Sequence, residues 1–64
     1  MSKIRRVREN LGLTQPELAR LSGVSVRTIA RAEDGEHLKE VTWSKILKGM
    51  NSVANLKKRL NDIR

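Results

Sequence analysis

The stretch TQPELARLSGVSVRTIARAEDG, residues 14–35, constrains the fold more strongly than any other part of the chain. Thr14 and Glu17 have the spacing of a capping box, in which a hydroxyl and a carboxylate bond free backbone N–H groups at a helix start. Pro16 fits the first helical turn, where its missing N–H costs nothing. Gly23 suits the left-handed conformation that commonly ends a helix. These residues predict a helix that starts after Thr14 and ends at Gly23.

A second helix is predicted directly after this turn, with Ser25 as its N-cap. Each helical residue turns the chain by about 100°, so Ile29 and Ala32 share one face. Arg27 and Arg31 lie almost opposite that face and one turn apart. The helix therefore has an apolar side for docking and a cationic side facing outward. Two helices joined by a short glycine-containing turn form a helix-turn-helix.

The pattern LGLTQxELAxLSGVSxxTIxRxExG, with x for any residue, resembles the helix-turn-helix domain of the lambdoid phage repressor and Cro family. Many small bacterial regulators and antitoxins share this superfamily. The close resemblance covers residues 4–35, and a weaker one continues to Val53. The matching residues are Gln15, Glu17, Leu18, Ala19, Gly23, Val24, Ser25, Ile29, Glu33 and Gly35. The resemblance implies an all-α, compact five-helix bundle with a central helix-turn-helix.

The remaining helices are predicted from caps and apolar spacing. Ser2 caps a first helix over residues 3–10, Thr42 caps a fourth over residues 43–51, and Ser52 caps a fifth over residues 53–63. Trp43 lies on an apolar helical face, which favours a core position over a base-stacking platform. The residues predicted to face inward are Ile4, Val7, Leu11, Leu18, Ala19, Leu21, Ser22, Trp43, Ile46, Leu47 and Met50.

Length and composition exclude several classes of protein. The 64 residues are enough for one small domain, residues 1–64. The absence of cysteine excludes disulfides and cysteine-based zinc sites, and His37 is a lone histidine in a polar loop. No apolar run is as long as a membrane helix, which needs about 20 residues. The sequence also predicts no signal peptide. We expect a cytoplasmic protein of a bacterial or phage-infected cell, with no cofactor, metal or enzymatic activity.

The net charge of +7 predicts a polyanionic partner, with double-stranded DNA as the first candidate. The second helix of the motif is expected to enter the major groove with its N-terminal end at the base edges. Arg27 is the first candidate for reading guanine O6 and N7, and Arg31 reads a second base or bridges phosphates. Val26 offers methyl groups to a thymine methyl.

Contacts to the DNA backbone are predicted for Gln15, Ser25, Thr28 and Lys39. Gln15 opens a helix, where the dipole and free N–H groups favour a phosphate. Ser25 and Thr28 reach phosphate or base, although capping competes for Ser25. The family often has a glutamine where this chain has Val26, so the usual adenine readout is not expected. Lys39 lies in a loop between two glutamates, which weakens its hold on phosphate.

Arg8 and Glu33 both lie at the edges of apolar helical faces, which suits neither charge. The simplest interpretation is an ion pair that ties the first helix to the third, and the family resemblance implies the same. Glu33 is therefore assigned a structural role. Two roles remain open for Arg8: it forms the ion pair alone, or it forms the ion pair and also contacts a phosphate.

The chain ends in a helix with apolar residues at 3,4,3 spacing and a run of cations. Leu56, Leu60 and Ile63 either complete the monomer core or contact a twofold mate. We expect a homodimer on DNA, because two modules about 34 Å apart read a palindromic operator. By resemblance, repression is the expected outcome. The alternative is an antitoxin-type module that binds a protein partner, with DNA autoregulation secondary. A membrane-surface protein is disfavoured, since the cations are spread over several helices.

Overall fold

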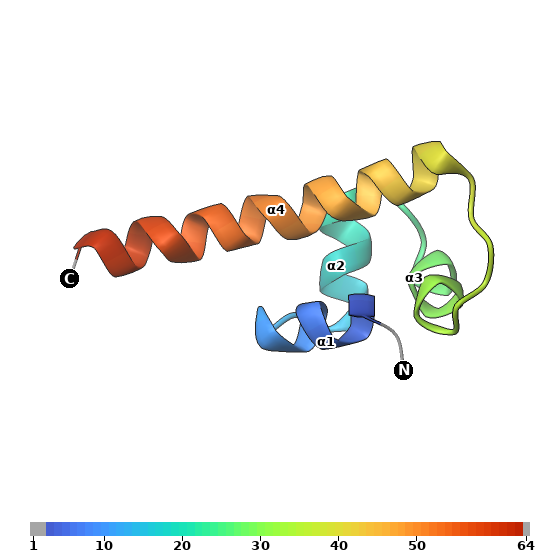
Figure 1. Ribbon diagram of the computed structural model, residues 1–64, viewed down its shortest axis with the longest axis horizontal. Coiled ribbons are helices and arrows are strands. Elements are labelled where there is room, and N and C mark those ends of the chain that lie inside the picture. Colours follow the sequence, from blue (N-terminus) through green and yellow to red (C-terminus); the bar gives the residue numbers. More distant parts are fainter. Residues whose placement is uncertain (1–2, 64) are drawn as a thin grey trace.

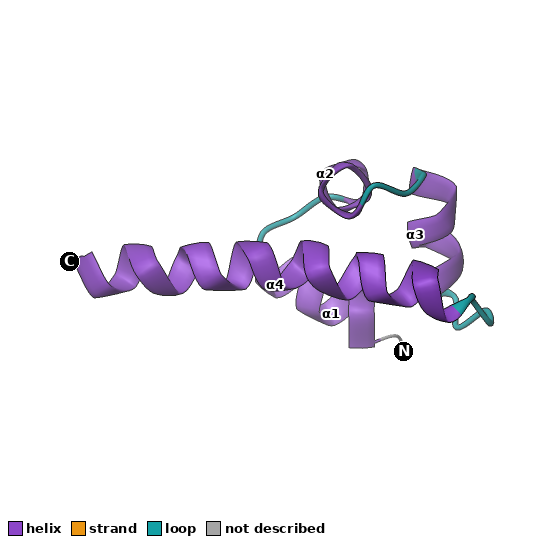
Figure 2. Cartoon of the chain, turned by 90° about the horizontal axis from the view of Figure 1, so that it is seen from above, coloured by secondary structure: helices purple, strands orange, loops and turns teal. Residues whose placement is uncertain are grey.

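The computed structural model describes the backbone of residues 3–63 and the side chains of residues 3–62. Within that part, the chain forms four helices. Their bounds are α1 Lys3–Asn10, α2 Gln15–Ser22, α3 Val26–Glu33 and α4 Glu40–Ile63. The first three helices gather against the N-terminal half of α4, whose other half projects away from them (Figure 1). The view from above shows the same arrangement (Figure 2). The predicted Ser2 cap and the side chain of Ile63 lie outside the described residues.

The predicted fifth helix is wrong, because α4 is continuous. It begins at Glu40, and the Trp43 backbone N–H donates to the Lys39 carbonyl oxygen at 3.1 Å. Thr42 is therefore inside the first turn and does not precede it. The Ser52 hydroxyl donates to the carbonyl oxygen of Lys48 at 3.0 Å. This bond to the preceding turn accommodates a serine within a helix, so Ser52 does not start a new one.

The predicted helix-turn-helix caps are confirmed. The Glu17 backbone N–H donates to Thr14 Oγ1 at 3.2 Å, and the Thr14 N–H donates to Glu17 Oε1 at 2.9 Å. Gly23 ends α2 with a φ of 71°, a left-handed conformation that suits a residue without a Cβ. The Thr28 N–H donates to Ser25 Oγ at 3.2 Å and fixes the start of α3. These local bonds set the angle at which α3 leaves α2.

A small apolar core joins the four helices. Its buried members are Ile4, Leu18, Ala19, Ile29, Ala32, Ile46 and Met50. Trp43 packs against this cluster as a partly buried residue, which confirms its predicted core position. The inward positions of Val7, Leu21 and Leu47 were wrong, since 42%, 48% and 49% of their surface is exposed. None of the described helices is long and apolar enough to cross a membrane.

Three small or polar residues are buried among the helices, and Ser22 is one that the sequence predicted to face inward. Arg8 is buried on α1 and Ser22 on α2. Gly49 is buried on α4. A Cβ built on Gly49 would lie 3.2 Å from the Ser22 backbone nitrogen and 3.3 Å from the Leu21 carbonyl carbon, and closer still to Ser22 Oγ. Gly49 therefore allows α2 and α4 to approach closely.

Replacing Gly49 with alanine is expected to destabilise the fold by about 1–3 kcal/mol, because the added methyl meets the backbone of α2. The gain of about 1 kcal/mol in helix propensity does not offset this contact. Urea unfolding followed by circular dichroism measures the change. Adding Ser22→Ala to Gly49→Ala should restore part of the loss, because the closest contact is then removed. A more stable Gly49→Ala protein would contradict this packing.

Candidate nucleic-acid interface

The two faces of α3 differ in burial and in charge. Ile29 is fully buried and Ala32 is 2% exposed, so one face is held in the core. Arg27 and Arg31 are exposed. Helix α3 also lies at the end of the molecule opposite the C-terminus (Figure 1). The chain thus presents a cationic helical surface on a rigidly docked element.

The two arginines differ in their partners. Arg31 Nε lies 3.4 Å from Glu36 Oε1, in an exposed ion pair. Among the described residues, no hydrogen bond or ion pair engages Arg27. Its five guanidinium N–H groups are therefore available for a bidentate acceptor such as a guanine edge. Arg31 would first have to share or leave Glu36.

The other predicted contact residues of α3 lie around its first turn. Val26 is 42% exposed. Ser25 and Thr28 are joined through their hydroxyl oxygens at 2.9 Å, in addition to the cap bond. Their hydroxyls thus hold the helix start, and one hydroxyl hydrogen of the pair is free to point elsewhere. Lys39 is exposed and directly precedes α4.

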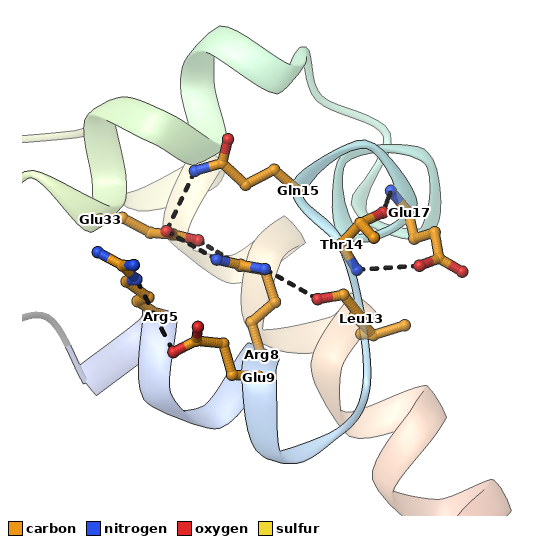
Figure 3. Close-up of polar contacts among 8 residues, drawn as sticks. All are labelled: Arg5, Arg8, Glu9, Leu13, Thr14, Gln15, Glu17 and Glu33. Carbon is orange, nitrogen blue, oxygen red and sulfur yellow. Dashed lines mark hydrogen bonds and ion pairs between the residues drawn. The ribbon is translucent and has the colours of Figure 1, made fainter.

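Gln15 makes a contact within the protein that the sequence analysis did not predict. Its Nε2 donates to Glu33 Oε1 at 3.1 Å, so the side chain joins α2 to α3 (Figure 3). The sequence contained a signal for this contact. Because Val26 cannot bond an amide, the Gln15 side chain has to find another polar partner, and the Glu33 carboxylate lies within reach.

Arg8 and Glu33 form the centre of this polar network. Arg8 Nε donates to Glu33 Oε2 at 2.6 Å and Nη2 donates to Oε1 at 3.2 Å, which makes the pair bidentate (Figure 3). A further Arg8 bond, from Nη1, reaches the carbonyl oxygen of Leu13 at 2.8 Å. The side chains are only 11% and 6% exposed. Together with Gln15, the network links α1, the loop before α2, and the end of α3.

The network also sets the charge state of Glu33. Burial alone raises the pKa of this carboxyl, but the hydrogen bonds from Arg8 and Gln15 and the charges of Arg8 and Arg5 outweigh burial. The net result is a pKa lowered from the ordinary value. The hydrogen bond to Glu33 raises the pKa of Arg8 in turn. Both groups are therefore held in their charged forms.

The lowered pKa of Glu33 makes the stability of the fold dependent on pH. Its contribution is fully present above the unfolded carboxyl pKa of about 4.3, and it is lost as the pH falls through the folded pKa. Glu33→Gln should therefore be less stable than the parent chain near neutral pH, and the difference should shrink in acid. Urea unfolding from pH 7 to pH 3 tests this. A difference that stays constant with pH would contradict it, and Glu36→Gln serves as the control.

No group of three or more histidine, cysteine, aspartate or glutamate side chains suited to a metal is found in the described part of the chain. His37 is exposed. The described polar contacts thus serve the architecture of the helix-turn-helix and leave the α3 surface as the functional candidate.

Comparison with known proteins agrees with this geometry. The family model HTH_3, described as helix-turn-helix, matches residues 4–54. That range covers α2, α3, all of α1 except Lys3, and the first part of α4. No significant match is found among curated proteins or solved structures. The chain belongs to the helix-turn-helix family of the XRE/Cro/C1 type, whose domain binds DNA.

Proposed function

We propose that this chain is a sequence-specific transcriptional regulator that reads double-stranded DNA through the major groove. One observation carries the proposal. Arg27 is exposed and unbonded on the first turn of α3, opposite the buried Ile29 and Ala32. In a helix-turn-helix this end of the second helix approaches the base edges. Arg27 is thus the residue that we assign to direct readout of guanine.

The surrounding residues are assigned to positioning. Thr28 and Lys39 contact phosphates, which set the register of the protein on the duplex without reading sequence. Gln15 donates one amide hydrogen to Glu33, and its second amide hydrogen remains for a phosphate. Arg31 bridges phosphate or reads a second base after leaving Glu36. Ser25 keeps its capping role.

A DNA-binding domain of this size needs two copies to bind a DNA site tightly and specifically. One module buries little surface, whereas two modules about one DNA turn apart add their contacts on a palindrome. We therefore propose a homodimer on DNA in the cytoplasm of a bacterial or phage-infected cell. Occupying an operator in this way excludes polymerase, so repression is the proposed outcome.

A second candidate function is supported by a different surface. Leu56 and Leu60 are each 55% exposed, so they do not complete the monomer core. A module that binds a protein partner through α4, with DNA autoregulation secondary, would use such a surface. This function is compatible with DNA reading by α3, because the two surfaces lie at opposite ends of the chain (Figure 1).

Selection from a pool of random duplex DNA tests the proposed function. The salt concentration should be high enough to suppress binding driven by charge alone, because each neutralised phosphate adds about 0.9 to the log–log salt slope. An inverted repeat with a guanine in each half-site is the expected result. Recovery of no preferred sequence would refute sequence-specific regulation and leave the protein-partner function.

A further inference from the structure

Most of the C-terminal half of α4 is exposed, and one hydrogen bond, from Lys57 to Asn10, joins it to α1. Residues 54–62 are all exposed, and this segment projects away from α1, α2 and α3 in both views (Figures 1 and 2). Short helices are marginal in water, and most of their stability in proteins comes from packing an apolar face. Packing against a second helix would therefore stabilise the projecting segment.

Its apolar residues form a narrow stripe. Val53, Leu56 and Leu60 follow 3,4 spacing and fall within about 60° of one another around the helix. This is the a/d spacing of a coiled-coil seam, with Leu56 at d between two a positions. The seam continues from the core, since Ile46 lies one heptad before Val53. A stripe this narrow suits one partner helix better than a membrane surface, which needs a broad apolar face.

Cations flank this stripe. Lys57 takes the e position and Arg59 the g position beside the seam, whereas Lys58 takes the outer f position. Lys57 Nζ also donates to the carbonyl oxygen of Asn10 at 3.4 Å, which places it on the side toward α1. The one acidic residue of the segment, Asp62, takes an outer c position. The seam is therefore apolar in the middle and positive at its edges.

These charges argue against a second copy of the chain as the occupant. In a parallel pair the g position of one helix faces the e position of the other, and in an antiparallel pair like positions face each other. None of the e and g positions from Ser52 to Arg59 holds an acid. A second copy thus offers no attractive pair across the seam, and Arg59 and Lys57 would meet cations or neutral residues.

DNA is also a poor occupant of this stripe. Helix α3, which we assign to DNA reading, lies at the end of the molecule opposite the projecting half of α4 (Figure 1). Phosphates would satisfy the cations but leave Leu56 and Leu60 exposed. An occupant that complements both features must supply apolar residues and carboxylates on one helix.

We propose that the stripe formed by Val53, Leu56 and Leu60 docks an acidic amphipathic helix of a protein partner. The partner helix places apolar residues at its a and d positions and glutamate or aspartate at its e and g positions. Its carboxylates face Lys57 and Arg59. This interaction rests on the second proposed function and names the chemistry of its protein partner, and it does not depend on DNA reading by α3.

A synthetic peptide pair tests the charge requirement. The probe is a fluorescein-labelled peptide of about three heptads with leucine at a and d and glutamate at e and g. The matched control has lysine in place of every glutamate. Anisotropy is measured while the full chain is titrated into each peptide. We expect the glutamate peptide to bind at least about tenfold more tightly than the lysine peptide, with binding weakened by salt.

Two pairs of variants locate the surface. Leu56→Asn combined with Leu60→Asn should weaken binding of the glutamate peptide at least about tenfold, whereas Leu47→Asn, on another face of α4, should not. Arg59→Glu should weaken binding much more than Lys58→Glu, although both change the net charge equally. All these side chains are exposed, so circular dichroism should show an unchanged fold.

Several results would overturn the proposal. These are failure of the glutamate peptide to bind, equal binding of the two peptides, or equal effects of Arg59→Glu and Lys58→Glu. A dimer in sedimentation that is lost in the Leu56→Asn, Leu60→Asn variant, without peptide binding, would assign the stripe to a second copy. Binding to phosphatidylserine vesicles without peptide binding would assign it to a membrane. Recovery of an operator in the DNA selection is independent of all these outcomes.

Discussion

Glu33→Ala is expected to destabilise the fold by about 3–5 kcal/mol, because it leaves the buried guanidinium of Arg8 without its counter-charge. The pair is bidentate and its side chains are 11% and 6% exposed, so water cannot replace the lost carboxylate. The change also removes the acceptor of the Gln15 side chain. Small domains are stable by roughly 5–15 kcal/mol, so a large part of the total would be lost. Urea unfolding monitored by circular dichroism measures this loss in the free energy of unfolding.

The matched control for this prediction is Glu36→Ala. Glu36 also pairs with an arginine, Arg31, but its side chain is 48% exposed and the pair distance is 3.4 Å. Exposed pairs are worth about 0–1 kcal/mol, so the control should change little. Combining Arg8→Met with Glu33→Ala should recover part of the loss, because the unpaired buried charge is gone. Equal losses for the two alanine variants would remove the ion pair from this account.

Arg27→Ala is expected to cost about 1–3 kcal/mol of discrimination at one base pair of each half-site, or about 5–150-fold. The physical reason is that a guanidinium bonding O6 and N7 of guanine together cannot be replaced by water or by a methyl group. Binding of the protein to its selected duplex and to duplexes with that base pair changed gives the discrimination directly. The variant should bind the two classes of duplex almost equally.

Lys58→Ala is the control for the loss of one positive charge. Lys58 is exposed on the projecting half of α4, far from α3. It should lower affinity slightly for all duplexes and leave discrimination unchanged, because it makes only a general electrostatic contribution. If Arg27→Ala selected the same half-site as the parent chain, the assignment of Arg27 to base readout would be wrong.

Local signals predicted the helix-turn-helix well. The capping box of Thr14 and Glu17, the left-handed Gly23 and the Ser25 cap each act within four residues, so the sequence alone specifies them. The bounds of α2 and the start of α3 follow from these caps. Exposure of Arg27 and Arg31 followed from the helical period alone.

Three features of the structure could not be predicted from caps and helical spacing. Ser52 has the chemistry of an N-cap, but its hydroxyl bonds the Lys48 carbonyl, and α4 continues. Gly49 allows close approach of the α2 backbone, a role that the sequence does not reveal. The bond from Gln15 to Glu33 joins residues that are far apart in the chain, so Val26 signals only that Gln15 lacks its usual partner and does not identify Glu33. The Gly49 and Gln15 contacts join two helices, whereas the Ser52 bond lies within α4.

The central claim is that DNA contacts α3 and not the basic end of α4. Nuclear magnetic resonance of the isotope-labelled chain, titrated with its selected duplex, tests this most directly. We predict that the largest chemical-shift changes fall on Gln15 and on residues 25–31, with small changes over residues 54–62. Changes centred on Lys57, Lys58 and Arg59, with residues 25–31 unaffected, would contradict the account.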